Sequence, residues 1–451
     1  MRSIKRVIAA VCAGLFIASA VAAQSGKAPI IIVPGLTGSE LVNRSTGEKV
    51  WFKLKRSDVD DVRLPISANL SANRDNLIPV DIIRSVQFAK FLPETEIYEK
   101  LIDSMQKSGG YREAKWNTAS RADAADTFFI FPYDWRRDNV ENARLLVRRI
   151  EALKARLGRP NLKFNVVAHS MGGLITRYAA MYGNADLPSG TPAPNWAGAR
   201  HFDKIFLIGT PNEGSLLSFE ALLNGVSYIG SGVKLPWVQD LDRFDVFTVP
   251  SIFQVLPFDG SFNLYDDELN PLKVDLYDPA TWDEYDWSVW KDDRFTKKFT
   301  TAEQRNARAY FIAALRRAKQ FHAALNANMR ENVPVSFYLM GGDCKDTQNG
   351  VIVRRNEKKD RWITQFNADS YTAASGKKIT SEQLKAVLYA VGDSVVPKRS
   401  LDLSTLRTNG HANILPVSSE LFQCEGHTKL VNNPDIQAKM FGILGTTIAA
   451  N

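Results

Sequence analysis

The sequence predicts an α/β fold with a mostly parallel sheet flanked by helices. Short apolar runs rich in β-branched and aromatic residues alternate with segments whose apolar residues recur at helical spacing. Such alternation is typical of strands joined by crossover helices rather than of hairpins. The expected strands are residues 29–34, 127–132, 163–168, 204–209, 333–341 and 384–391.

One helix is clearly marked between the second and third expected strands. Residues 139–158 carry apolar side chains at helical spacing, and Gly158 and Pro160 follow as stop signals. The strand, the helix and the next strand together predict a βαβ unit. This unit delivers Ser170 to the carboxyl edge of a central strand, where open α/β sheets bind their ligands.

The third expected strand ends abruptly at Ser170. The segment Ala168-His169-Ser170-Met171-Gly172 has a small residue two positions on either side of the serine. A tight strand-to-helix turn needs this lack of bulk, and it exposes a serine hydroxyl for attack on an acyl carbonyl. Glycine is usual at both positions, so Ala168 is a departure. The alternative, an ordinary helix N-cap, leaves the paired small residues unexplained. His169 is expected to point elsewhere and to pack or hydrogen-bond locally.

The alternation of strands and helices stops after Gly209-Thr210-Pro211 and resumes near Val333. We therefore expect a cap or lid inserted at residues 212–330. It would separate a first core segment, 24–211, from a second, 331–451. Residues 302–330 predict one long helix that returns the chain to the sheet, and residues 345–380 predict a polar hairpin insertion.

The expected cap is rich in aromatic residues set among acidic ones. An aromatic excursion over an active site can form an apolar channel for acyl chains. The equally favoured alternative is that these side chains form the core of the cap itself. They are Phe219, Trp237, Phe244, Phe247, Phe253, Phe258, Phe262, Trp282, Trp287 and Trp290.

The first 23 residues have the organisation of a secretory signal peptide. Basic residues precede an apolar run from Val7 to Val21, and small residues close the segment. A retained membrane anchor is the alternative, but the run is shorter than the roughly 20 apolar residues that span a bilayer. We therefore expect an exported protein, secreted or periplasmic.

The charge of the chain gives no support to nucleic-acid binding. The formal net charge is +8, and cleavage after residue 23 would remove three basic and no acidic residues, which leaves +5. The densest basic group, at residues 354–361, is interrupted by Glu357 and Asp360. We interpret it as a solvated loop face, although it also allows weak attraction to an anionic lipid surface.

Cys344 and Cys424 are the only cysteines after the expected cleavage site. An even pair in an oxidising compartment is typical of a disulfide, so we expect these two to be bonded. The alternative is two buried thiols that never meet.

A nucleophilic serine needs a base, and the chain order on this kind of fold is serine, acid, histidine. His201 precedes an expected strand and so lies at the wrong edge of the sheet, and His322 lies within the expected long helix. His427 is favoured over His411 because its loop contains glycine and leads into the final helix. The histidines after the serine are His201, His322, His411 and His427.

The orienting acid is expected in a loop at the end of a strand. Residues 387–391 predict the strand and Gly392-Asp393-Ser394-Val395-Val396-Pro397 the loop, which makes Asp393 the candidate. Asp343 and Asp346 also follow an expected strand, and they are competitors on sheet position alone. A turn-forming role is the structural alternative for Asp393.

A tetrahedral intermediate needs two backbone N–H donors for its oxyanion. Met171, directly after the serine, offers one. The other is expected in Pro34-Gly35-Leu36-Thr37-Gly38-Ser39, which follows the first expected strand. Gly35 permits a sharp exit that aims the Leu36 amide inward.

Several motifs taken together resemble the lecithin:cholesterol acyltransferase family, from about residue 29 to His427. The resemblance implies an α/β-hydrolase fold, a triad of Ser170, Asp393 and His427, and an oxyanion hole made by Leu36 and Met171. The family usually has Gly-Asp-Gly/Asp-Thr-Val around the acid, so Ser394 and Val395 are departures that leave the aspartate intact. The motifs are residues 34–41 (PGLTGSEL), 132–136 (PYDWR), 168–173 (AHSMGG), 250–257 (PSIFQVLP) and 392–397 (GDSVVP), followed by Ser400-Leu401.

The resemblance implies a secreted serine-dependent lipid acyl hydrolase or acyltransferase that works through an acyl-enzyme on Ser170. A lipid is the expected substrate, transient contact with a lipid surface is allowed, and no metal or other cofactor is expected. Asp134 and Arg136 are expected to brace the site rather than to react. Two alternatives stay open: an esterase or deacylase of a non-lipid conjugate, and a catalytically inactive lipid-binding protein on the same fold.

Overall fold

The structure of the protein is a computed structural model. It describes residues 26–53, 61–86, 95–226, 240–258, 260–329, 333–356, 358, 360–411 and 413–445. The expected signal peptide at 1–23 and Trp237 lie outside the described residues. Among the helices of the described ranges, none combines the length and the apolar composition needed to cross a membrane.

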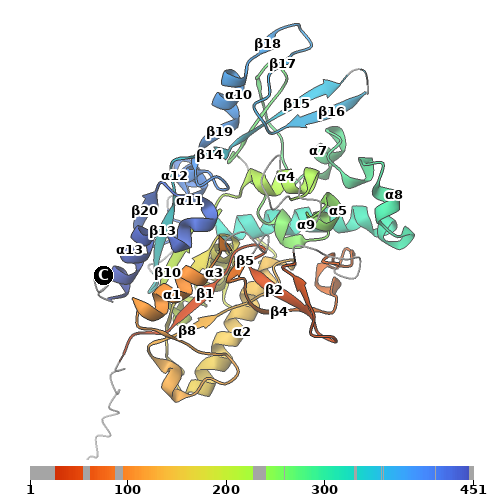
Figure 1. Cartoon of the computed structure of the whole chain (residues 1–451). Coiled ribbons are helices and arrows are strands. Elements are labelled where there is room, and N and C mark those ends of the chain that lie inside the picture. Colours follow the sequence, from red (N-terminus) through yellow and green to blue (C-terminus); the bar gives the residue numbers. More distant parts are fainter. Residues whose placement is uncertain are drawn as a thin grey trace, which may run out of the picture.

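A seven-stranded sheet forms the centre of the molecule (Figure 1). Its strands are β1 (Ile30–Val33), β7 (Arg112–Glu113), β8 (Thr127–Ile130), β9 (Phe164–His169), β10 (Phe202–Ile208), β13 (Ser336–Gly342) and β20 (Val417–Gln423). They lie in the order β20-β13-β10-β9-β1-β8-β7, and every pairing is parallel. The predicted fold class, a parallel sheet flanked by helices, is therefore confirmed.

Alternate residues of the central strands enter two separate hydrophobic layers. In β1, Ile31 and Val33 pack in the layer that contains α2 (Asn139–Leu157) and α3 (Met171–Tyr182). Ile30 and Ile32 pack in the layer of α1 (Glu99–Lys107) and α13 (Pro434–Leu444). Successive side chains of a strand point to opposite faces, so a sheet covered on both sides needs apolar residues at every position. This is why β1 is an unbroken apolar run.

The chain between β10 and β13 is mainly helical, and Figure 1 shows it between the main sheet and the strands at the top of the picture. The long helix α9 begins at a capping box formed by Thr300 and Glu303 and ends at Leu325, five residues before the predicted end. The elements are α4 (Leu216–Asn224), α5 (Arg243–Phe247), α6 (Pro250–Phe253), β11 (Asn263–Tyr265), β12 (Pro271–Leu272), α7 (Pro279–Glu284), α8 (Phe295–Lys298) and α9 (Thr301–Leu325).

A second sheet joins this helical segment to the hairpin predicted at residues 345–380. In that hairpin, β15 (Gly350–Asn356) and β16 (Arg361–Gln365) pair antiparallel, and β15 also pairs in parallel with β11. The resulting order is β12-β11-β15-β16. Chain segments on both sides of β13 therefore share one small sheet. The expected boundaries of a cap at 212–330 stay a prediction.

The strand predicted at 384–391 is largely wrong. Residues Ser381–Leu388 form helix α10, and only β19 (Tyr389–Gly392) is extended. This strand pairs antiparallel with β14 (Lys345–Gln348), outside the main sheet. Leu384 and Leu388 are buried one helical turn apart, so the apolar run that suggested a strand is the buried face of a short helix.

The last strand of the main sheet is instead β20, which the sequence did not indicate. Its residues are half-buried or exposed, because it lies at the edge of the sheet, and its sequence is accordingly mixed in polarity. The remaining elements outside the two sheets are β2 (Ser39–Asn43), β3 (Lys49–Trp51), β4 (Leu77–Ile82), β5 (Ser85–Val86), β6 (Thr95–Glu96), β17 (Tyr371–Thr372), β18 (Lys378–Ile379), α11 (Lys398–Leu401) and α12 (Ser404–Thr408).

Candidate active site

Ser170 lies in a sharp turn between β9 and α3. Its backbone has φ 53° and ψ −128°, in a region that a residue with a side chain rarely adopts. A Cβ atom at Gly172 would lie 2.4 Å from the carbonyl oxygen of Pro34 and 2.6 Å from that of Val33. The turn thus presses the start of α3 against the end of β1, which explains the need for a small residue two positions after the serine.

The imidazole of His427 lies between Ser170 and Asp393. Its Nε2 atom is 3.0 Å from Oγ of Ser170, and its Nδ1 atom is 2.7 Å from Oδ2 of Asp393. A carboxylate only accepts hydrogen bonds, so Nδ1 carries the proton and Nε2 is free to accept the serine proton. The structure therefore brings together three side chains that are far apart in the sequence.

Asp393 is fully buried, and its carboxylate has several donors. Oδ1 accepts from the N–H groups of Val395 and Val396, at 3.0 and 2.7 Å. Ser394 has a φ of 79°, and its N–H donates to Thr347 Oγ1 at 2.9 Å. Since Val395 contributes only its backbone N–H to the acid, its difference from the family pattern does not affect this contact.

Among the described residues, none of the competing acids and bases, Asp343 included, hydrogen-bonds to the side chain of Ser170 or of His427. Asp346 is exposed within β14, where it pairs with Val391. His411 Nδ1 lies 2.9 Å from the carbonyl oxygen of Asn326. His201 lies 3.2 Å from Lys154 Nζ, and burial together with that ammonium lowers the pKa of His201 to about 4. Burial likewise lowers the pKa of His322, in α9, to about 4.

The two expected oxyanion donors adjoin the serine. Leu36 and Met171 line the same cavity as Ser170 and His427. Within the part of the chain that the structure describes, neither backbone N–H donates to another atom. A Cβ atom at Gly35 would lie 2.8 Å from Cβ of Ser170, so glycine is needed for the loop to approach the serine this closely. Two free N–H groups beside a hydroxyl are what an oxyanion hole requires.

A cavity of about 300 Å³ contains the Ser170 hydroxyl. Trp135, Thr37 and Thr428 lie among its lining residues, but most of the wall is aliphatic. Helices α4, α5 and α6 with their flanking loops supply this wall, which includes Leu217, Ala221, Leu241, Val246, Val249, Ile252 and Val255. An apolar wall beside a reactive hydroxyl suits a hydrocarbon chain.

The aromatic residues of the helical segment do not form this wall. None of those predicted as channel residues that the structure describes lines the cavity. They pack on one another instead: Phe219 contacts Trp282 and Trp287, and Phe247 contacts Phe253. Of the two interpretations of these side chains, the structure supports the core of the helical segment and not the channel.

Arg136 is buried in an ion-pair cluster next to the cavity. Its guanidinium donates to Asp134 at 2.8 and 2.9 Å, and to Asp75, which no motif in the sequence marks. Although burial by itself lowers the pKa of Arg136, the two carboxylates raise it above its ordinary value. Trp135, between Asp134 and Arg136, faces the cavity, so the cluster fixes the segment that carries a wall residue.

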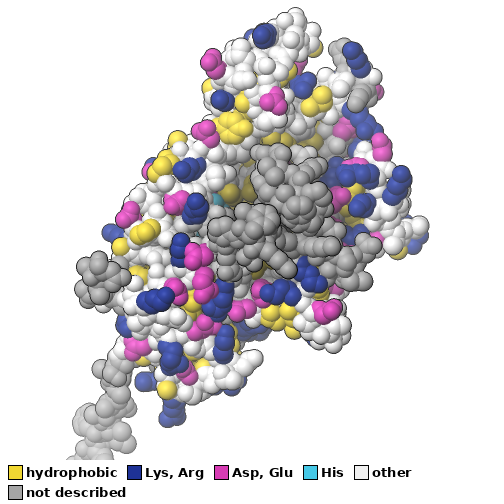
Figure 2. All heavy atoms as spheres, viewed as in Figure 1, with side chains coloured by type: hydrophobic (Ala, Val, Ile, Leu, Met, Phe, Trp, Pro, Cys, Tyr) yellow, Lys and Arg dark blue, Asp and Glu magenta, His cyan; other side chains and the backbone are white. Residues whose placement is uncertain are grey.

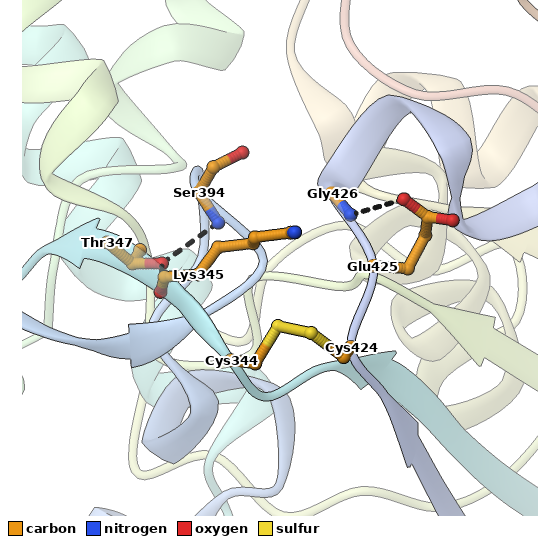
Figure 3. The surroundings of a disulfide bond; sticks show 7 residues. All are labelled: Cys344, Lys345, Thr347, Ser394, Cys424, Glu425 and Gly426. Atoms are coloured by element: carbon orange, nitrogen blue, oxygen red, sulfur yellow. Dashed lines mark hydrogen bonds between the residues drawn. A yellow bond between two sulfur atoms is a disulfide. The ribbon is translucent and has the colours of Figure 1, made fainter.

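The expected disulfide between Cys344 and Cys424 is present, with the two Cα atoms 5.0 Å apart. Figure 3 shows it between the segment that leads into β14 and the loop of Glu425 and Gly426 that precedes His427. The bond thus ties the histidine loop to the neighbouring strand end.

Tyr98 and His169 form a contact behind the serine that the sequence did not reveal. The hydroxyl of Tyr98 lies 2.8 Å from Nδ1 of His169 and accepts from the N–H of Gly35 at 2.9 Å. His169 is buried and hydrogen-bonded, but its partners, Tyr98 and the backbone of His427, are distant in the sequence rather than local. No spacing rule could have paired Tyr98 with a residue 71 positions later.

The described surface carries both signs of charge. Figure 2 shows basic and acidic side chains interspersed over the face that it presents. In the basic group at 354–361, Arg355 pairs with Asp360, and Arg361 pairs with Asp293 at 3.2 Å. In the described residues no group of three or more His, Cys, Asp or Glu side chains could hold a metal ion.

Comparisons with known proteins agree with this fold. Residues 83–236, about a third of the chain, match the family model of lecithin:cholesterol acyltransferase. No curated protein matches the chain. A chain in the crystal structure of the Tle4-Tli4 complex has a TM-score of 0.54 and 14% identity over 94% of this chain and 99% of that one.

Other solved structures are less similar. The mature form of the Bacillus licheniformis lipase BlEst2 has a TM-score of 0.34 and 11% identity, over 94% of this chain and 93% of that one. The lin2722 gene product of Listeria innocua has the same TM-score and identity, with 94% and 96% covered. Over residues 83–236 the chain is therefore similar to the lecithin:cholesterol acyltransferase family, and its parallel sheet agrees with the α/β-hydrolase fold that this similarity implies.

Proposed function

We propose that the protein is a serine-dependent lipid acyl hydrolase or acyltransferase that works through an acyl-enzyme on Ser170. One observation carries the proposal: Ser170 and His427, hydrogen-bonded in series to the buried Asp393, line a cavity with an aliphatic wall. A serine, a neutral imidazole and a buried carboxylate in this order can activate a hydroxyl for attack on an ester.

In the first half of the reaction, Oγ of Ser170 attacks the ester carbonyl while Nε2 of His427 takes its proton. Asp393 holds the imidazole in the required tautomer and stabilises the imidazolium that forms. The N–H groups of Leu36 and Met171 would bind the oxyanion of the tetrahedral intermediate. As the intermediate collapses, His427 returns the proton to the departing alcohol, and the acyl group stays on Ser170.

In the second half, water or another alcohol attacks the acyl-enzyme. His427 removes the proton of the incoming hydroxyl and then gives it back to Ser170. Attack by water releases a fatty acid, whereas attack by an alcohol forms a new ester. The same side chains serve both outcomes, so access to the intermediate decides between hydrolysis and transfer.

A lipid substrate is supported by two independent observations. The aliphatic side chains from α4, α5 and α6 offer an acyl chain an apolar wall. The matching family model is that of an acyltransferase for a lipid. We also propose that residues 212–330 act as the cap of the site. The disulfide supports export to an oxidising compartment, secreted or periplasmic.

The proposal is tested by a panel of phospholipids, triacylglycerols and short esters, each with and without an added alcohol acceptor. Free fatty acid and new ester are measured for the wild type and for Ser170→Ala. We expect acyl release or transfer from lipids that the variant lacks. Turnover of short esters alone would favour an esterase of non-lipid conjugates. Lipid binding without any turnover would favour an inactive lipid-binding protein.

A further inference from the structure

Three hydrogen bonds run behind Ser170 from the loop after β1 to the loop of His427. The N–H of Gly35 donates to the hydroxyl oxygen of Tyr98 at 2.9 Å. The same hydroxyl lies 2.8 Å from Nδ1 of His169, and Nε2 of His169 lies 3.1 Å from the carbonyl oxygen of His427. Tyr98 and His169 are both buried, at 2% and 7% exposure.

The groups at the two ends of this series, the Gly35 N–H and the His427 carbonyl oxygen, determine which atom donates and which accepts in each of its hydrogen bonds. A backbone N–H can only donate, and a backbone carbonyl can only accept. His169 must therefore carry its proton on Nε2 to donate to His427. Its Nδ1 atom is then an acceptor, which is satisfied by the Tyr98 O–H, while the Tyr98 oxygen accepts from Gly35. All three bonds are made together only when His169 is neutral and in this tautomer.

The surroundings keep His169 neutral. Burial, and then the positive charge that His427 carries when protonated, lower the pKa of His169 to about 3. Burial also raises the pKa of Tyr98, so its hydroxyl keeps its proton. The imidazolium that His427 would form during the reaction therefore has no second cation beside it, although the two rings have centroids 5.0 Å apart.

The series joins the three loops that meet at the reacting atoms. Gly35 precedes Leu36, His169 precedes Ser170, and the last acceptor is the backbone of His427 itself. Because Tyr98 accepts from the Gly35 N–H, the peptide between Pro34 and Gly35 is held in place, and it leads directly into the peptide that carries the Leu36 N–H. Tyr98 lies at the start of α1. The backbone carbonyl oxygen of the preceding residue, Ile97, accepts a hydrogen bond from Asn432 Nδ2 at 3.0 Å.

We propose that Tyr98 and His169 are positioning residues, which act as one unit to hold the Leu36 N–H and the His427 ring in register with the Ser170 hydroxyl. This inference rests on the proposed function. Neither side chain lines the substrate cavity, so neither is expected to contribute to substrate binding. Their loss should lower kcat, through a displaced oxyanion donor, and leave KM nearly unchanged.

The test uses Tyr98→Phe, His169→Leu and the double variant of the full chain, with p-nitrophenyl butyrate as substrate. The matched control is Tyr182→Phe, which removes another buried tyrosine hydroxyl that donates to a backbone carbonyl oxygen, that of Ala324 at 2.9 Å, and that does not line the cavity. Thermal unfolding of each variant reports the structural cost. The rate of labelling of Ser170 by a fluorophosphonate gives a second readout that does not depend on the choice of substrate.

We expect Tyr98→Phe to lower kcat by about 10- to 100-fold, with KM within about twofold. Its labelling rate should fall with kcat. The double variant should be no slower than the slower single variant, because either change already breaks the series. Tyr182→Phe should keep kcat within about twofold despite a similar fall in the unfolding temperature.

Two results would overturn the inference: a kcat for Tyr98→Phe equal to that of the control, or losses that multiply in the double variant. If Tyr98→Phe does not fold, the kcat and KM of His169→Leu test the proposal in its place. A higher KM with an unchanged kcat would then contradict it. A wild type that neither turns over the ester nor reacts with the fluorophosphonate would instead contradict the proposed function. The two failures are therefore distinguishable.

Discussion

Two hydrogen bonds join His427 to Asp393. Its ring Nδ1 lies 2.7 Å from the carboxylate, and its backbone N–H donates to the Asp393 carbonyl oxygen, also at 2.7 Å. One residue thus fixes both the orientation of the imidazole and the position of the loop that carries it. The two bonds can be separated experimentally, because only the first depends on the side chain.

Asp393→Asn should remove the carboxylate and keep the backbone bond. The amide can present a donor to Nδ1 and favour the wrong tautomer of His427, so we expect kcat to fall by roughly 10³- to 10⁴-fold. Circular dichroism and the unfolding temperature should change little. Asp346→Asn, at the competing position, serves as the control. Equal activities of the two variants would show that Asp393 is not the acid.

Removal of the disulfide should affect both stability and activity. The bond spans 80 residues, and the chain-entropy model then gives an upper value of about 4.5 kcal/mol for its contribution to the free energy of unfolding. The bond also anchors the loop before His427. We expect the Cys344→Ser, Cys424→Ser double variant to lose stability in urea titrations and to show a lower kcat. A stability equal to that of the oxidised wild type contradicts this expectation.

The aliphatic wall should select the acyl chain. Ala221, in α4, lines the cavity, so Ala221→Phe would fill space that a long chain needs. We expect kcat/KM for p-nitrophenyl decanoate to fall more than tenfold, since each lost methylene contact is worth about 0.8 kcal/mol. The value for the acetate ester should change little. Asn224→Leu, on the exposed side of the same helix, is the control, and an equal loss for both esters would contradict the assignment.

His322 should make stability depend on pH. Burial, and then the nearby charge of Arg177, lower the pKa of His322 to about 4, whereas the unfolded chain has about 6.5. Between these values the unfolded chain binds more protons, so this contribution to the free energy of unfolding is lost as pH falls from about 6.5 to about 4.

His322→Phe keeps an aromatic ring beside Phe258 and Tyr277 and removes the titration. Over that pH range we expect the slope of unfolding free energy against pH to decrease by up to about 1.4 kcal/mol per pH unit. Denaturant titrations at several pH values measure it. An unchanged slope would show that His322 does not titrate as described.

The parts of the site that were predictable are those set by local sequence. The turn at Ser170 needs small neighbours whatever surrounds it, and Gly172 shows the reason in its contact with the end of β1. The loop after Gly392 predicts Asp393 as the acid, although most of the strand predicted before this loop is helical. The family resemblance, which includes the loop residues 392–397, is what favours Asp393 over Asp343 and Asp346.

The parts that were not predictable depend on contacts between distant segments. Tyr98 and Asp75 precede their partners His169 and Arg136 by 71 and 61 residues, and neither lies in a pattern that marks it. The edge strand β20 needs no apolar alternation, because much of it is in contact with solvent. The aromatic residues between β10 and β13 could serve a channel or a core equally well until their contacts were known.

The central claim is that Ser170 is the nucleophile activated by His427. The most direct measurement is labelling of the intact protein with a fluorophosphonate, followed by mass spectrometry of the peptides, for the wild type, Ser170→Ala and His427→Ala. We expect a single modified residue, Ser170, in the wild type and no modification in either variant. Labelling at another serine, or lipid turnover that persists in Ser170→Ala, would contradict the account.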